Sequence, residues 1–343
     1  MLKKLLYLTI LFISSYLFAM EVKTIINLGN LTPEAIESIL NKITINKAKN
    51  FQKNLRYILK TRRILLSAIK LKYAPPILAK IEIDIDNRLS EILANNYSKE
   101  ILNNNLLAAI ADDNYITTKL LIGARADVNA KDLDGSTALM YAVENNNIDI
   151  ANLLISAGAK ISSSDKKGWT ALHVASYYGN IDSVRLLLQK GAEINKKTKV
   201  GNTALNHASL KGHKNIVNLL ISNGADVNSR DIDGGIPMMD AVNNNHKDVV
   251  EIMINAGADI NAKDNKGWTV LMRASLNGYK DIVKLLLQNR ADVNAKNNDG
   301  WTALKLAETH NQKEIADILK AAGAKEEGYI EKIWKFIGGK EEI

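Results

Sequence analysis

A fixed spacing of glycines constrains this chain more than any other feature. A glycine recurs at every thirty-third position with no insertion between the copies, at Gly135, Gly168, Gly201, Gly234, Gly267 and Gly300. The segment around one of them, residues 264–296, reads DNKGWTVLMRASLNGYKDIVKLLLQNRADVNAK, and the other segments repeat its order of polar and apolar residues. A constant period of this length predicts a stack of small helical units, each of which buries its apolar faces against its neighbours.

One unit, residues 165–197, shows how the pattern is expected to fold. It opens with Asp-Lys-Lys-Gly, and Gly168 supplies the backbone angles that a tight turn needs. Thr170 then precedes a short helix over 171–178, and a second helix follows over 181–189. Gly191 stops that helix in the left-handed cap position.

The order of turn, Thr-x-Leu, first helix, Gly-Ala-Asp-Val-Asn and return loop resembles the ankyrin repeat, over about Asn103 to Ala324. The resemblance implies an all-α ankyrin-repeat solenoid that works as a protein-binding scaffold. Within the array, 102–325, the first unit is incomplete, because Leu102 stands where a turn glycine is expected. The full units are 132–164, 165–197, 198–230, 231–263, 264–296 and 297–325.

The repeats depart from the family pattern at several places. The family favours Thr-Pro-Leu-His before the first helix, and only His173 keeps that histidine. The unit 231–263 departs most, because it reads Gly-Ile-Pro-Met-Met and loses the threonine, so we expect it to be the weakest unit. Arg125 and Arg290 replace cap glycines, which costs on the order of 1 kcal/mol if the backbone stays left-handed.

Residues 1–20 predict a secretory signal peptide. Lys3 and Lys4 precede an apolar run over 5–18, and Ala19 is a small residue at the expected cleavage site. The run is shorter than the roughly 20 residues that a membrane span needs. The alternative is an uncleaved inner-membrane anchor over residues 5–19. Both interpretations predict export from a bacterial cytoplasm, to the periplasm or beyond.

Residues 21–101 do not repeat and predict a helical segment that caps the array. Helices are expected over 33–43, 47–71 and 77–97. The third contains IEIDID, which alternates like a strand, but the apolar residues over 81–92 also fit a helix, and the helical neighbours favour it.

This N-terminal third is strongly basic. Residues 1–102 hold 16 Lys/Arg and 8 Asp/Glu, which gives the whole net charge of +8, and the span 38–81 has 11 Lys/Arg and no carboxylate. The charged side chains either lie solvated on the outer face of the cap or bind an anionic membrane surface through Lys47–Lys72. Nucleic acid is not expected, because export would separate the protein from it and no binding motif accompanies the charge.

The tail, 326–343, carries one apolar helical face. It is expected to cap the open end of the last repeat. The alternative is an anchor for a membrane or a partner through Trp334 and Phe336.

No catalytic motif, phosphate loop or metal-binding spacing occurs, and the chain has no cysteine. The prediction is a non-catalytic protein without a cofactor. An enzyme whose active site lay in 21–101 would have only Glu82, Asp84 and Asp86 as paired carboxylates.

The expected binding groove is lined by the turns and the exposed sides of the first helices, as the resemblance implies. One row follows the turn glycines and holds three tryptophans, which are common in binding hot spots, although each indole could instead pack flat on the adjacent turn. The predicted protein-binding residues of a monomeric protein are Trp169, Tyr177, Tyr178, Lys199, Asn202, Lys211, Trp268 and Trp301. Another row, on the first helices, aligns His207, Asp240 and Arg273, either as a catalytic or ligand-binding cluster or, as we expect, with an Asp240–Arg273 ion pair.

Overall fold

A computed structural model describes residues 32–41, 43, 51–70 and 75–325. These residues form seventeen helices, α2 to α18, and no strand beyond an isolated bridge between Ser164 and Thr170. The all-α class is therefore confirmed. Contacts divide the chain into two compact units, residues 1–132 with 156–158 and residues 133–155 with 159–343. The predicted signal peptide and the predicted tail helix lie outside the described residues.

The N-terminal unit contains five of the helices, among them the three that were expected before the repeats. Helix α4 contacts α2, α3 and α6, and α5 contacts α6. Their bounds are α2 Pro33–Asn41, α3 Phe51–Ile69, α4 Pro75–Asn96, α5 Lys99–Ala111 and α6 Tyr115–Gly123.

Helical periodicity decides the form of α4. Ile85 and Leu89, four residues apart, are fully buried, as are Ile58 and Leu65 of α3. Ile83 is 53% exposed, so the alternation of IEIDID does not mark a strand face. The prediction of a helix here is confirmed, because residues three and four apart share one helix face.

The incomplete first repeat begins with a longer helix in place of a turn. Ser98 caps α5 by accepting a hydrogen bond from the Ile101 amide. Leu102, at the position of the turn glycine, lies inside α5 and is buried. The first unit therefore lacks its turn, as expected.

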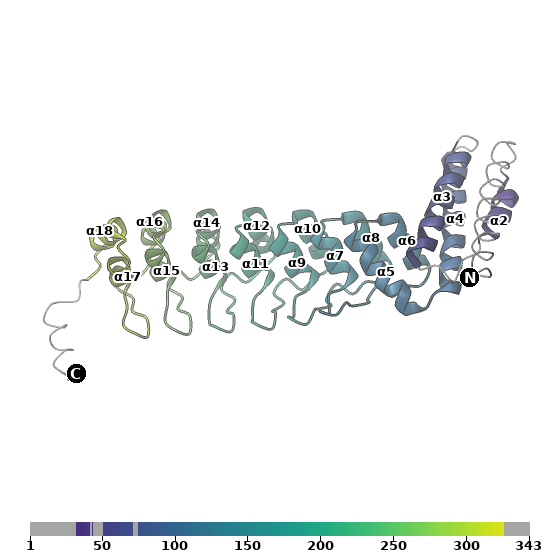
Figure 1. Ribbon diagram of the computed structural model, residues 1–343. Helices are drawn as coiled ribbons and strands as arrows, with labels where there is room; N and C mark the ends of the chain where they lie inside the picture. The colour runs from purple at the N-terminus through teal and green to yellow at the C-terminus, as the bar shows by residue number, and fades with distance from the viewer. Residues whose placement is uncertain (1–31, 42, 44–50, 71–74, 326–343) are drawn as a thin grey trace. The chain divides into compact units, whose positions relative to one another are not determined.

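The second compact unit contains the six full repeats, and each repeat contributes one pair of antiparallel helices at the period of the glycines. Figure 1 shows the second helices of the repeats, here called outer, in one row, the first, inner helices in a second row, and the turns projecting beyond the inner row. The inner helices are α7 Ala138–Glu144, α9 Ala171–Tyr178, α11 Ala204–Lys211, α13 Pro237–Asn243, α15 Val270–Leu276 and α17 Ala303–Thr309. The outer helices are α8 Ile148–Ser156, α10 Ile181–Gln189, α12 Lys214–Ser222, α14 Lys247–Asn255, α16 Lys280–Gln288 and α18 Lys313–Ala321.

The Thr-x-Leu pattern starts each inner helix except one. Threonine is the N-cap residue of five inner helices, and the leucine two positions on is buried in each. In α13 the N-cap is Ile236, which offers no side-chain acceptor, and Pro237 follows at the first helical position. Met238 takes the leucine's place and is fully buried. The unit 231–263 thus keeps its packing but lacks the cap.

Backbone hydrogen bonds join each turn to the next. The Lys166 amide donates to the Asp134 carbonyl at 2.9 Å, and the Lys199 amide donates to the Lys167 carbonyl at 3.0 Å. Gly168, with φ of +85°, is required at this approach, because a Cβ there would lie 2.8 Å from the Lys199 nitrogen. The row of turns is therefore rigidly spaced.

Asparagine and histidine side chains add further ties between repeats. The Asn195 Oδ1 accepts from the Asp226 amide at 2.9 Å, and the Asn of each later Asp-x-Asn does the same for the repeat after it. Nε2 of His213 lies 3.0 Å from the Tyr177 carbonyl of the preceding repeat. His173 instead bonds within its own repeat, to the Thr170 amide and the Lys196 carbonyl.

Candidate functional site

The three tryptophans after the turns are held by the turns themselves. The Trp169 amide donates to Oδ1 of Asp165 at 2.8 Å, and the Asp165 amide donates back to the Trp169 carbonyl at 2.9 Å. Equivalent pairs of bonds fix Trp268 and Trp301. All three residues are half-buried. Each indole therefore starts from a fixed backbone position and presents part of its surface to solvent.

Of these three tryptophans, only Trp169 belongs to a larger aromatic group. Its ring centroid lies 4.1 Å from that of His207 in the next repeat and 5.4 Å from that of Tyr177. Tyr177 and Tyr178 are 5.3 Å apart, edge to face. We call Trp169, Tyr177, Tyr178 and His207 the aromatic cluster. Edge-to-face and offset contacts at these separations are stabilising, so α9 and α11 hold a preformed aromatic surface.

The four side chains of the aromatic cluster differ in their exposure to solvent. His207 is buried, whereas Trp169 and Tyr177 are half-buried and Tyr178 is 51% exposed. Burial and the neighbouring His173 lower the pKa of His207 to about 3. The ring of His207 is therefore neutral at pH 7, and the Trp169 ring packs against it.

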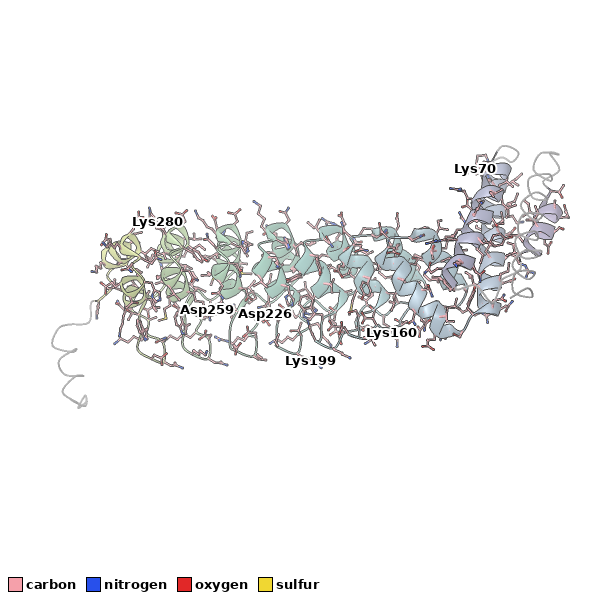
Figure 2. All side chains as sticks on the ribbon, viewed as in Figure 1. Lys70, Lys160, Lys199, Asp226, Asp259 and Lys280 are labelled. Atoms are coloured by element: carbon pink, nitrogen blue, oxygen red, sulfur yellow. The ribbon has the colours of Figure 1, made fainter. Side chains whose placement is uncertain are left out.

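Lysines and a polar turn border the cluster. The Lys211 ammonium lies 4.4 Å from the centre of the Tyr177 ring, a cation–π contact. Lys199 is exposed at the tip of the next turn, on the turn side of the array in Figure 2. Asn202 closes that turn, since its carbonyl accepts from the Thr198 amide at 2.8 Å.

The structure thus brings together one part of the predicted site and leaves another apart. Trp169, Tyr177, Tyr178 and Lys211 share direct ring contacts, and Lys199 and Asn202 lie on the adjoining turn. Trp268 and Trp301 belong to the repeats 264–296 and 297–325 and make no ring contact with the cluster. The Lys305 ammonium lies 4.6 Å from the centre of the Trp301 ring.

His207 is the member of the cluster that the sequence did not predict. The repeat pattern aligns it with Asp240 and Arg273 and does not place it against Trp169. The contact joins residues of neighbouring repeats that are far apart in the chain. His207 follows Trp169 by one repeat length and five further positions, and a search for aromatic residues at that offset would have indicated the contact.

The expected Asp240–Arg273 ion pair is wrong. Arg273 donates from Nη2 to Oδ2 of Asp264, at the start of its own repeat, and from Nη1 to Asn243. Asp240 accepts from the Asn206 Nδ2 at 2.8 Å, and burial raises its pKa to about 6. Arg273 thus pairs with the turn carboxylate of its own repeat, and Asp240 bonds Asn206 of the preceding repeat, so no His–Asp–Arg cluster forms.

A second polar centre lies in the N-terminal unit. The Arg62 guanidinium of α3 bonds Asp86 of α4 at 2.6 Å and Glu82 at 2.7 Å, and Lys119 of α6 bonds Asp86 at 3.0 Å. Arg62 and Asp86 are buried, whereas Asp84 is exposed. Burial alone would raise the pKa of Asp86, but the bonds from Arg62 and Lys119 outweigh it and lower that pKa. Two of the three carboxylates therefore hold helices together.

Other cations on and directly after α3 point away from this centre. Arg56, Lys60 and Arg63 of α3 and Lys70, which follows its last residue, are exposed and spaced at helical intervals along one face (Figure 2 labels Lys70). We call them the α3 cation row. The apolar face of α3 is buried in the unit. The row can therefore bind an anionic surface by charge, without inserting apolar side chains.

Within the described ranges, no group of three or more His, Asp or Glu side chains is arranged to hold a metal ion. None of the helices in the same ranges is both long and apolar enough to span a membrane.

Comparison with known families agrees with the repeat geometry. The family model for ankyrin repeats (3 copies) matches residues 106–198, 193–264 and 238–327. These matches together span 106–327, which is more than half of the chain. No curated protein matches the chain. Ankyrin repeats mediate protein–protein interactions, and the family is typically non-enzymatic. The chain belongs to the ankyrin repeat family.

Proposed function

We propose that this protein is a non-catalytic scaffold that binds another protein through the inner helices and turns of the repeats 165–197 and 198–230. The observation that carries the proposal is the aromatic cluster, in which an exposed Tyr178 stands on a fixed base of Tyr177, Trp169 and His207. Tyrosine and tryptophan dominate binding hot spots, because they supply large contact areas at a low entropic cost.

Rigid support strengthens this proposal. The Trp169 backbone is closed into its turn, and the turn is bonded to the next one at the Lys199 amide. Side chains that are already ordered lose little conformational freedom when a partner binds. Among the predicted binding residues, those of these two repeats are therefore the ones that we place at the centre of the interface.

Affinity capture with the full chain tests the proposal. Tyr177→Ala/Tyr178→Ala removes the rim of the cluster, while Tyr115→Ala removes another exposed tyrosine on α6 as a matched control. We expect captured proteins to be lost with the double variant and retained with the control, with both variants folded by circular dichroism. Retention of every captured protein by the double variant would refute the groove as the working surface.

A second candidate function is binding to an anionic membrane surface, and the α3 cation row favours it. Four exposed cations share one face, while Arg62, the buried cation of the same helix, is neutralised by Asp86. Flotation with vesicles containing phosphatidylserine should retain the protein at low salt, because surface charge interactions are screened as salt rises. Arg56→Gln/Lys60→Gln/Arg63→Gln should abolish flotation, and Lys247→Gln/Lys284→Gln/Lys313→Gln on the outer helices should not.

We also propose that residues 1–20 direct export of a monomeric protein from a bacterial cytoplasm. The short apolar run and the small residue at position 19 support cleavage rather than an anchor over 5–19. N-terminal sequencing of the protein from separated cell fractions distinguishes cleavage from anchoring. We expect a mature protein that starts near residue 20. A protein that keeps Met1 and is found in the membrane fraction would contradict cleavage.

A further inference from the structure

Positive charge in the repeats is concentrated beside the aromatic cluster. Residues 103–325 hold 26 Lys/Arg and 24 Asp/Glu, a net charge of +2. The segment 190–225 alone holds six lysines and one glutamate, a net charge of +5, so the rest of the array has a net charge of −3. The repeats as a whole are therefore nearly neutral, with one basic region.

Four lysines of this region and its neighbour border the cluster. Lys166, Lys167 and Lys199 are exposed on two adjacent turns that are joined by the Lys199–Lys167 backbone bond, and Lys211 lies over the Tyr177 ring. None of the four forms an ion pair with a carboxylate in the described part of the chain. Some lysines on the outer helices do, as in Lys214–Asp248 and Lys280–Glu314.

A substitution in the turn 198–201 removes the usual negative charge. Asp165, Asp231 and Asp264 close their own turns with a carboxylate oxygen. In the turn 198–201 the Thr198 hydroxyl does so instead, accepting from the Asn202 amide at 3.2 Å. The turn keeps its conformation while Lys199 stays without a neutralising carboxylate beside it.

Aspartates limit this basic surface on both sides. The preceding turn carries Asp134 and the following turn carries Asp231 and Asp233. Two stacked turns cover about 20 Å, since packed helices are spaced by about 10 Å. An extended peptide of about six to eight residues has that length. Exposed apolar surface lies within the same span, at Tyr178 and at Val200, which is 48% exposed.

We propose that the repeats 165–197 and 198–230 bind an extended acidic segment of a partner protein that carries one aromatic or aliphatic anchor. The anchor packs on Tyr178 and Trp169, and the carboxylates pair with Lys166, Lys167, Lys199 and Lys211. This inference rests on the proposed function and names the chemistry of the partner. Charge complementarity carries it, because opposite charges across an interface set both the encounter rate and the choice of partner.

Selection from a library of displayed random peptides of about twelve residues, long enough to cross both turns, tests the inference with the full chain. The selected peptides should be rich in Asp and Glu around one apolar residue. Lys166→Gln/Lys167→Gln/Lys199→Gln should weaken a selected peptide by about tenfold, the sum of several exposed charge pairs. The control Lys247→Gln/Lys284→Gln/Lys313→Gln, which removes equal charge from the outer helices, should leave its Kd unchanged.

The outcomes separate the two proposals. Selected peptides without an acidic bias, or insensitive to the turn lysines, would overturn the inference; if Tyr177→Ala/Tyr178→Ala still abolished their binding, the groove proposal would stand. A library that yields no binder would overturn both. Polyuridine RNA and phosphatidylserine vesicles are tested in parallel, and binding of either one through the turn lysines, without an acidic peptide binder, would also overturn the inference.

Discussion

At the scale of single residues, the repeat frame imposes backbone angles that the side chain cannot always accommodate. Arg290 follows α16 with φ of +66°, where Gly158, Gly191, Gly224, Gly257 and Gly323 stand in equivalent repeats. Arg125 has the same angle in the first repeat. Both arginines therefore keep the left-handed conformation of the glycines, and each carries the strain that glycine avoids.

Exchanging the two residue types should change stability in opposite directions. Arg290→Gly is expected to raise the free energy of unfolding by about 1 kcal/mol, and Gly257→Ala to lower it by about 1 kcal/mol. Gly257 has φ of +84°, and no atom lies within 4 Å of the place that an alanine Cβ would take, so conformation alone acts there. Urea titrations of both variants check the prediction. A loss of stability in Arg290→Gly would show that contacts of the guanidinium outweigh the strain.

His207 should make stability depend on pH. Its pKa is lowered to about 3 in the folded protein, whereas histidine in an unfolded chain titrates near 6.5. Between these values the unfolded chain binds a proton that the folded one does not. The stability contributed by neutral His207 is complete above about pH 6.5 and is lost progressively as the pH falls toward 3. Asp240, with a pKa raised to about 6, acts in the opposite direction between about pH 4 and 6.

His207→Leu isolates this contribution, because Asp240 and His173 are present in both proteins. Leucine occupies the equivalent position 306 of the last repeat. From pH 7 to pH 5 the variant should lose about 2 kcal/mol less stability than the parent, the linkage value for about 1.5 pH units. Chemical denaturation at both pH values measures the difference. The exposed His310→Gln variant serves as control, and an equal pH dependence in all three proteins would contradict the assignment.

At the scale of elements, helix pairing in the N-terminal unit depends on a buried charge cluster. Arg62 of α3, Asp86 of α4 and Lys119 of α6 are joined by hydrogen bonds, with Arg62 and Asp86 buried. A buried ion pair adds little over an apolar pair, but removal of one partner leaves an uncompensated charge. The cluster therefore makes the packing of three helices depend on single side chains.

Asp86→Asn should destabilise the protein by about 3 kcal/mol, because the buried Arg62 guanidinium then keeps only the partly exposed Glu82 as an anionic partner and Lys119 loses its carboxylate. Asp84→Asn, on the exposed side of the same helix, is the matched control and should change stability by less than about 0.5 kcal/mol. Urea unfolding followed by far-ultraviolet circular dichroism reads both. Equal effects of the two substitutions would exclude a special role for the buried pair.

Much of this element structure was predictable, and the reasons are local. The helices before the repeats follow from apolar residues at spacings of three and four, and the missing first turn follows from Leu102 at the position of the turn glycine. The choice of Asp264 over Asp240 by Arg273 was not predictable, since both carboxylates occur at plausible spacings. Only the positions of the turn and the preceding inner helix in space select between them.

At the scale of the whole array, constant spacing makes one repeat replaceable by the next. α13 contacts α11 on one side and α15 on the other, and the same buried positions recur one repeat length apart. Deletion of residues 231–263 should therefore let α11 pack on α15, and the shorter protein should unfold cooperatively with the same helical content per residue.

Deletion of residues 247–263 alone is the control, because it leaves α13 without its outer helix and exposes the apolar faces of its neighbours. We expect this protein to unfold at a lower temperature than the one that lacks the whole repeat, although it loses fewer residues. Thermal unfolding followed by circular dichroism compares the two. The reverse order would mean that the unit 231–263 has a specific role that its neighbours cannot take over.

The sequence by itself determined the period, the two helices of each repeat and their caps. These features depend on residues within one repeat, whose spacing fixes which face is apolar and where the backbone must turn. Tertiary structure alone decided that His207 supports Trp169, that Lys211 covers Tyr177 and that the unpaired lysines lie on adjoining turns. Those contacts join different repeats, so they depend on how the repeats stack, and a residue's place within its own repeat does not specify its neighbours in the next.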